Sequence, residues 1–241
     1  MSDILHLESI VKKYGNKTIV NSLSFTVKKG EVVGLLGPNG AGKTTAFYMT
    51  IGLISPDSGK IYFNNQDVTK LPIHKRAQMG MGYLAQEPSI FKGLSVEDNI
   101  LAILETLAIP LQEQKTRLEK LLDELHLTHL RHSKASFLSG GERRRLEITR
   151  CLVTEPTLLL LDEPFANVDP ITVSDVKQMI AILKNKGISI LITDHNAREI
   201  FTIADRSYLI VEGRVIASGK TDELMHHEEA KKRYLGNDFR L

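Results

Sequence analysis

The chain has 241 residues and nearly balanced charges, with 31 Lys and Arg against 29 Asp and Glu. Its 42% hydrophobic and 25% charged residues are typical of a globular protein and exclude wholesale disorder, and the net charge of +2 argues against a nucleic-acid binder that relies on a general positive field. The single cysteine, Cys151, excludes an internal disulfide and fits a reducing compartment.

The first part of the chain predicts a β-rich region that leads into an α/β core. Residues 4–11 and 18–27 alternate apolar and polar side chains, as half-buried strands do. The elements expected next are a fully buried strand, a helix and two short strands, at residues 31–36, 43–52, 60–63 and 81–85. A glycine-rich loop separates the buried strand from the helix.

A helical subdomain is predicted as an insertion over residues 87–152. Its apolar side chains recur at helical spacing, as at Leu118, Leu121, Leu122 and Leu125. Residues 95–98, Ser-Val-Glu-Asp, have the spacing of a capping box, which predicts that a helix starts there.

The core resumes at residue 153 and alternates strands with helices. The expected strands lie at 158–161, 188–193, 207–211 and 214–217, and the expected helices at 171–186 and 197–204. This alternation predicts a mainly parallel sheet and an α/β class. Residues 1–86 and 153–217 would then form the core together with an N-terminal antiparallel β subdomain, and residues 218–241 a helical tail.

Nothing in the sequence predicts a segment that enters a membrane. No stretch approaches the roughly 18 uninterrupted apolar residues that a membrane span requires. The first residues, MSDILHLESIVKKYG, lack a basic start followed by a long apolar block, so no secretory signal is visible. We therefore expect a cytoplasmic protein whose contact with a membrane comes through a partner.

The buried strand at 31–36 runs into a phosphate-binding motif, G-x-x-x-x-G-K-[ST]. The residues of the motif are Gly37, Pro38, Asn39, Gly40, Ala41, Gly42, Lys43 and Thr44, with Thr45 following in the helix. Glycines allow successive N–H groups to turn inward around phosphate oxygens, and the helix N-terminus adds its positive end. We expect Lys43 to reach the β- and γ-phosphates of a nucleotide and the Thr44 hydroxyl to ligate Mg²⁺. A glycine-rich turn without a ligand is the alternative.

An acidic pair, Asp162 and Glu163, ends the apolar strand at 158–161. A nucleoside triphosphatase needs a carboxylate for its metal and a group that orients water. We expect Asp162 to hold Mg²⁺ and Glu163 to act on the attacking water as a general base. Taken alone the pair would be interpreted as a helix cap, but together with a phosphate-binding loop the catalytic interpretation is favoured.

Between these elements lies Leu138-Ser139-Gly140-Gly141-Glu142, and here the chain resembles the nucleotide-binding subunits of ATP-binding cassette (ABC) transporters, whose signature reads LSGGQ. The resemblance covers nearly the whole chain and implies a P-loop NTPase (RecA-like) core within one ABC ATPase domain, residues 1–241. It also implies that Tyr14 stacks on adenine and that His195 contacts the γ-phosphate. Gln86 would link the core to the helical subdomain and to the metal. Asn167-Val168-Asp169 would form the D-loop.

The resemblance further implies a homodimer. Ser139, Gly140 and Gly141 open a helix, so their amide groups predict an anion site. In the family this segment covers the ATP that a second subunit holds, which gives a head-to-tail pair with ATP at the seam. The chain departs from the family at three places: Glu142 stands where the family has glutamine, Ala-Asn-Val-Asp replaces Ser-Ala-Leu-Asp at the D-loop, and Ala85 replaces a common proline. The departures at Glu142 and at the D-loop leave the details of the dimer interface open.

Four further segments resemble the ATPases of lipopolysaccharide exporters in Gram-negative bacteria. They are SGGERRR at 139–145, DEPFA at 162–166, TDHN at 193–196 and YLGNDFRL at 234–241. This resemblance implies a pair of inner-membrane permease subunits, with the present chain attached to their cytoplasmic face. Branched-chain amino-acid importers have similar ATPases and are the alternative. A soluble ABC ATPase that acts on DNA or ribosomes and a small-molecule kinase are further alternatives.

A permease helix is expected to dock in a groove beside the segment that follows Gln86. Ile90, Phe91 and Leu94 are the candidates for its apolar wall. Packing inside the helical subdomain is an equal alternative for Ile90 and Leu94. Phe91 lies in an expected loop, and for it we favour the groove.

Overall fold

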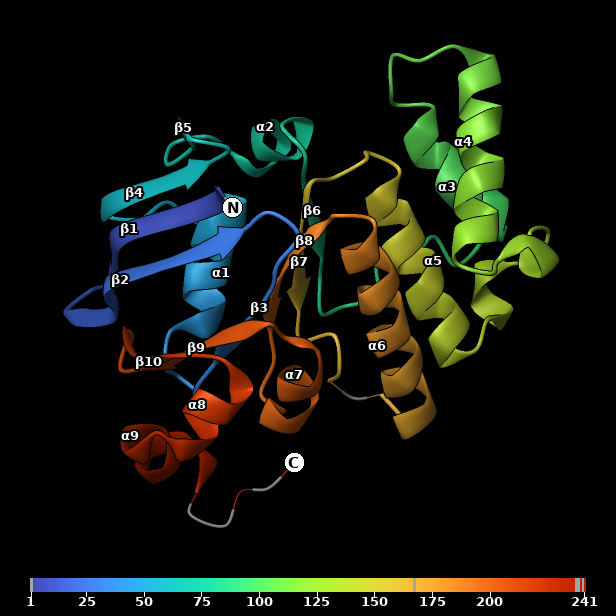
Figure 1. The fold of residues 1–241 in the computed structure, drawn as a ribbon. Coiled ribbons are helices and arrows are strands. Elements are labelled where there is room, and N and C mark those ends of the chain that lie inside the picture. Colours follow the sequence, from blue (N-terminus) through green and yellow to red (C-terminus); the bar gives the residue numbers. More distant parts are fainter. Residues whose placement is uncertain (1, 167, 237–238, 240) are drawn as a thin grey trace.

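A six-stranded sheet runs through the centre of the fold (Figure 1). The computed structural model describes residues 2–166, 168–236, 239 and 241. The strands of this sheet are β3 (Val32–Leu36), β6 (Met81–Leu84), β7 (Leu158–Asp162), β8 (Ser189–Thr193), β9 (Arg206–Val211) and β10 (Arg214–Gly219). Their order is β10-β9-β3-β8-β7-β6, and every neighbouring pair is parallel except β9 and β10.

Side chains of these strands alternate between two hydrophobic clusters, one on each face of the sheet. In β7, Leu158 and Leu160 face one cluster while Leu159 and Leu161 face the other. Burial on both faces explains why the strand is apolar throughout, because parallel sheets are covered on both sides. Helix α1 (Lys43–Ile51) packs on the first face, and α5 (Gly140–Leu152), α6 (Pro170–Asn185) and α7 (Ala197–Ile203) pack on the second.

A second, antiparallel sheet covers α1 on its outer side (Figure 1). It contains β1 (Asp3–Tyr14), β2 (Lys17–Lys28), β4 (Ser58–Phe63) and β5 (Gln66–Asp67), in the order β2-β1-β4-β5. The short helix α2 (Ile73–Gln78) follows. From it the buried Arg76 donates through Nη1 to the carbonyl oxygens of Met49 and Thr50, which closes the C-terminal end of α1.

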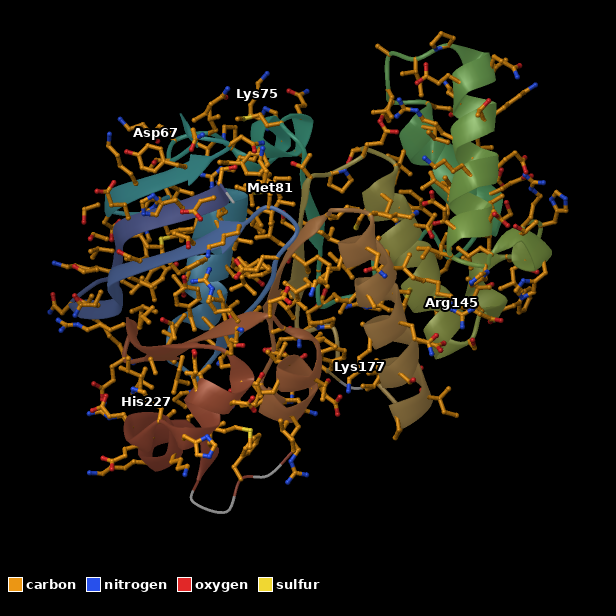
Figure 2. All side chains as sticks on the ribbon, in the orientation of Figure 1. Asp67, Lys75, Met81, Arg145, Lys177 and His227 are labelled. Carbon is orange, nitrogen blue, oxygen red and sulfur yellow. The ribbon has the colours of Figure 1, made fainter. Side chains whose placement is uncertain are left out.

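Helices α3 (Val96–Leu104), α4 (Leu111–Glu124) and α5 form the inserted region, together with two short 3-10 helices, η1 (Thr128–Leu130) and η2 (Ala135–Phe137). The predicted capping box is confirmed at α3, where Ser95 and Asp98 exchange hydrogen bonds. Figure 2 labels Arg145 on α5, and its Nη2 donates to Oδ2 of Asp175 in α6 at 2.7 Å. This ion pair joins the inserted region to the core.

The tail consists of α8 (Thr221–His226), α9 (Glu228–Ala230) and a π-helical turn, η3 (Lys231–Leu235). It packs beside the sheet edge formed by β9 and β10. Among the helices that the structure describes, none is both long and apolar enough to cross a membrane.

The predicted fold class is confirmed: a mainly parallel sheet carries helices on both faces, with an antiparallel sheet in the N-terminal part and a helical insertion. Two elements were not predicted, β5 and α2. Both are short, with two and six residues, so neither repeats its period often enough to be recognised.

Candidate active site

Four of the predicted site segments lie where four adjacent parallel strands end. In the order β3-β8-β7-β6, the strands are followed by the phosphate-binding loop, His195, Glu163 and Gln86 respectively. Ligands of open α/β sheets bind outside the carboxyl ends of the strands. The topology therefore brings together four segments that lie far apart in the sequence.

The phosphate-binding loop has backbone angles that favour glycine. Gly37 and Gly42 have φ of 148° and 96°, and a Cβ atom on them would lie 2.0 Å and 2.6 Å from the carbonyl oxygens of Ile210 and Ile19. Helix α1 starts at Lys43 with Gly42 as its N-cap, no side chain caps it, and its first turn holds no acidic residue. The N–H groups at this helix end are thus left available to an anion.

Lys43 folds back over the loop. Its Nζ donates to the carbonyl oxygens of Gly37 at 2.6 Å and Pro38 at 3.0 Å. Burial lowers the pKa of the Lys43 ammonium, while the nearby carboxylates of Glu163 and Asp194 act in the opposite direction. Phosphate oxygens could replace these two carbonyl partners, since both kinds of oxygen accept hydrogen bonds from the ammonium.

The two carboxylates after β7 differ in their surroundings. Asp162 is buried, and burial together with the charge of Glu163 raises its pKa to about 6. Glu163 is half-buried and has a φ of 44°, which turns the chain sharply after the strand. Its Oε2 accepts a hydrogen bond from Gln86 Nε2 at 2.9 Å. Gln86 therefore contacts Glu163 without help from a ligand.

His195 follows β8 with an exposed ring, whose Nδ1 lies 3.8 Å from Glu163 Oε2. Tyr234 in the tail donates to the His195 carbonyl oxygen at 3.1 Å, and burial raises the pKa of the Tyr234 phenol to about 12. Asp194, which directly precedes His195 in the chain, is fully buried and was not predicted as a site residue. A charged residue directly after a strand with an apolar centre, Ile190 to Ile192, was the sequence signal that could have identified it.

The signature segment lies elsewhere in the fold. Helix α5 starts after Ser139, whose Oγ accepts from the Glu142 backbone N–H at 3.3 Å while Glu142 Oε2 accepts from the Ser139 N–H at 2.7 Å. Hydrogen bonds that the Glu142 carboxylate accepts from Ser139 lower the pKa of Glu142. Gly140 and Gly141 lie against Thr172 and Asp175 of α6, on the sheet face opposite α1. Within the described residues, no hydrogen bond joins this segment to the phosphate-binding loop.

The remaining predicted residues lie around this centre. Tyr14 ends β1 with half of its surface exposed, and Lys12 Nζ lies 5.7 Å from the centre of its ring. Asp169 caps α6 through Oδ1, which accepts from the N–H groups of Ile171 and Thr172. Asn167, predicted within the D-loop, is outside the described residues.

The candidate groove residues have three different environments. Ile90 is buried in the core cluster, so the alternative of internal packing holds for it. Leu94 is 39% exposed and Phe91 is 48% exposed, with the Arg150 guanidinium 4.6 Å from the centre of the Phe91 ring. The buried Asn99 fixes the Phe91 backbone, accepting from its N–H at 2.8 Å and donating to its carbonyl oxygen at 3.0 Å.

The donors that could meet a metal are all oxygen atoms. In the described part of the chain, no three His, Cys, Asp or Glu side chains gather into a metal-binding cluster. Asp162 supplies a carboxylate and Gln86 an amide oxygen, while Thr44 adds an exposed hydroxyl at the start of α1. Mg²⁺ prefers hard oxygen ligands and commonly takes one or two carboxylates together with substrate phosphates, so this donor set fits it.

Comparisons with known proteins agree with this geometry. The sequence profile of the family described as ABC transporter matches residues 20–166. A protein of Acidithiobacillus ferridurans named lipopolysaccharide export system ATP-binding protein LptB is 49% identical over 241 residues, which cover all of both chains. The protein of the same name from Escherichia coli K12 is 48% identical over 238 residues, which cover 98% of this chain and 99% of that one.

A solved structure shows the same fold. The ADP conformation of MJ1267, described as an ATP-binding cassette of an ABC transporter, superimposes with a TM-score of 0.88 at 30% identity. The match covers 98% of the present chain and 100% of the other. Sheets, helical insertion and tail are thus all included in the similarity.

Proposed function

This chain belongs to the ABC transporter family, and we propose that it is the ATP-hydrolysing subunit of a lipopolysaccharide export system. The proposal is supported by relatives of that name that align almost from end to end at 47% to 49% identity. The observation that carries the ATPase part is the placement of the phosphate-binding loop, Gln86, Glu163 and His195 at the ends of four adjacent strands.

The loop after β3 would bind the triphosphate. The uncapped start of α1 offers N–H donors to phosphate oxygens, and Lys43 would exchange its carbonyl partners for the β- and γ-phosphates. The half-exposed ring of Tyr14 would stack on adenine. Thr44, Gln86 and Asp162 would hold Mg²⁺, which neutralises phosphate charge when it is bound.

Glu163 would take a proton from the attacking water. Its carboxylate is half-buried and held by Gln86, so it is oriented before the substrate arrives. Gln86 would connect the γ-phosphate position with the helical region that follows it. His195, whose ring nitrogen lies 3.8 Å from the same carboxylate, would contact the γ-phosphate from the next strand.

A second copy of the chain would complete the site. The signature segment, Ser139 to Glu142, starts a helix on the other face of the sheet, so it would not reach phosphates bound at the loop of its own chain. In a head-to-tail dimer it would cover the ATP of the partner. Dimer closure would then be a condition for turnover.

The permease partners would bind at Phe91 and hold the chain at the cytoplasmic face of the inner membrane. Exposure of a large aromatic ring on a loop that Asn99 fixes supports this assignment. Replacement by alanine should weaken co-purification with the permease subunits from membranes. Leu111→Ala, at an exposed leucine on α4, is the control, and equal co-purification of both variants would contradict the assignment.

Glu163→Gln tests the catalytic proposal. We expect a protein that binds ATP, hydrolyses it very slowly and forms an ATP-dependent dimer on size-exclusion chromatography. Glu155→Gln is a matched control, because Glu155 also has a positive φ, of 50°, and also precedes a proline, but lies at the opposite end of β7. A Glu163→Gln monomer with normal turnover would contradict the proposal.

A further inference from the structure

The chain beyond β7 forms a turn whose backbone donors are almost all accounted for. Asp162 pairs with Thr193 at the end of the ladder between β7 and β8, and the Glu163 N–H donates to the Thr193 carbonyl oxygen at 2.7 Å. Pro164 has no N–H, and Ala166 donates to the Glu163 carbonyl oxygen at 3.1 Å. The Phe165 N–H is the remaining donor of this turn, and it is buried.

Asp194 supplies the acceptor for that donor. Its Oδ2 accepts from the Phe165 N–H at 3.0 Å, and its Oδ1 accepts from the Asn196 N–H at 2.8 Å. The first bond reaches the turn that carries Glu163, and the second closes the turn that carries His195. One carboxylate therefore joins the two turns beyond the point where the β7–β8 ladder ends.

We propose that Asp194 is a positioning residue for ATP hydrolysis, which fixes the Glu163 turn and the His195 turn relative to each other. This inference rests on the catalytic role proposed for Glu163. Backbone shifts of about 1 Å at a reacting group can cost about a hundredfold in rate, so a bond that sets the relative position of two such turns has a large influence on turnover.

The buried charge of Asp194 would act on substrate binding in the opposite direction. The carboxylate is close enough to Lys43 to raise the pKa of its ammonium, and it repels any anion that Lys43 binds. Burial raises the pKa of Asp194 itself, as expected for a carboxyl group that is fully removed from solvent. Removal of the charge should thus favour binding of the triphosphate, whereas loss of position should slow its hydrolysis.

Asp194→Asn separates the two effects. The amide keeps the size of the side chain but presents one acceptor and one donor group, so one of the two backbone N–H groups loses its bond. In steady-state hydrolysis of Mg-ATP by the full chain, we expect kcat to fall about tenfold and KM to stay equal or decrease. A kcat within twofold of the parent, or a raised KM with unchanged kcat, would overturn the inference.

A matched control distinguishes positioning from general stability. Asp205 also accepts a backbone N–H from a neighbouring strand, that of Val32 at 3.0 Å, but at the amino ends of the strands. Asp205→Asn should lower the unfolding midpoint and leave kcat unchanged. A tenfold loss of kcat in Asp205→Asn would mean that any loss of a side-chain hydrogen bond to the sheet slows turnover. That result would overturn the positioning role of Asp194.

The double variant with Glu163→Gln shows whether Asp194 acts through Glu163. In a single-turnover assay, Asp194→Asn should slow hydrolysis no further in the Glu163→Gln protein, because residues that act together are not additive. A further tenfold loss would mean that Asp194 does not act by placing the Glu163 turn, which overturns the inference. If Glu163→Gln alone hydrolyses ATP normally, the proposed function fails as well; if it is inactive while Asp194→Asn has the parent kcat, the positioning role alone fails.

Discussion

Two helix N-termini in this chain are predicted to meet phosphate, and the structure builds them differently. Helix α1 starts after Gly42 in a left-handed conformation, without a side-chain cap and without an acidic residue in its first turn. Helix α5 starts after Ser139 and satisfies its own N–H groups with a capping box, in which Glu142 places a carboxylate at the helix end. The first end lacks an internal acceptor, whereas the second already has one.

This difference fits two kinds of phosphate contact. An uncapped end gains its missing hydrogen bonds from an anion, so α1 should bind a nucleotide within a single chain. A capped end has little to gain, and the charge of Glu142 opposes a second negative group. The α5 end should therefore add little to nucleotide binding within a single chain, and we expect it to meet a nucleotide only when a partner chain brings one to it.

The largest expected effect is on the α1 side. Lys43→Ala removes the ammonium that would bind the β- and γ-phosphates, and charged hydrogen bonds are worth about 1.5–3 kcal/mol each. We expect nucleotide affinity to fall at least about tenfold, measured with a fluorescent ATP analogue. Lys60→Ala, at an exposed lysine on β4, should bind as the parent does. Equal affinity in the Lys43 variant would contradict the assignment of the loop.

Ser139→Ala tests the α5 side. Loss of an N-cap costs about 1 kcal/mol of folding free energy, and the hydroxyl that would face the partner's ATP is lost with it. Turnover should fall while nucleotide affinity of the single chain stays unchanged. Both quantities can be measured on one preparation, by phosphate release and by binding of the fluorescent analogue.

The second capping box of the same region provides the control. Ser95 and Asp98 start α3 with the same reciprocal bonds, outside the signature segment. Ser95→Ala should lower the free energy of unfolding by a similar amount, about 1 kcal/mol, and leave turnover unchanged. If both serine variants lost turnover equally, the effect would come from stability, and the role of Ser139 at a partner's ATP would be wrong.

The sequence predicted the main features of the fold because they follow from local periods. Apolar strands that alternate with helices indicate a parallel sheet, and the phosphate motif lies between a strand and a helix as expected. Helix α2 was missed because six residues give less than two turns. Its Arg76 is buried against backbone carbonyl groups, and residue identities alone do not reveal such partners.

Site residues that belong to a sequence motif were predictable. A site residue whose hydrogen-bond partners are backbone groups was not. Glu163 and His195 follow strands that the topology makes neighbours. Asp194 binds the N–H of Phe165, 29 positions away, and any residue other than proline could supply that donor. The capping box at Ser139 was missed although Ser139 and Glu142 have the required spacing, because the segment was interpreted as an anion site.

A smaller effect is expected from Glu142→Gln. The glutamine oxygen can still accept from the Ser139 N–H, so the cap remains, but the negative charge that faces the seam is removed. At low ionic strength this should tighten the ATP-dependent dimer by about twofold to fivefold, since a charge at a helix end is worth about 0.3–1 kcal/mol. Sedimentation of the Glu163→Gln protein with and without the second substitution would measure it, and a weaker dimer would contradict the comparison.

The smallest expected effect is a pH dependence of the α5 cap. Hydrogen bonds from Ser139 lower the pKa of Glu142 below its ordinary value of 4.5, so the ionised form is favoured in the folded chain. The stabilisation is therefore complete above pH 4.5 and is lost as the pH falls through the lower pKa of the folded state. Urea unfolding of the parent and of Glu142→Gln should give free energies that differ most near neutral pH and converge in acid. A difference that grows as the pH falls would show that the carboxylate of Glu142 does not stabilise the start of α5, and the contrast between the two helix ends would then rest on Ser139 alone.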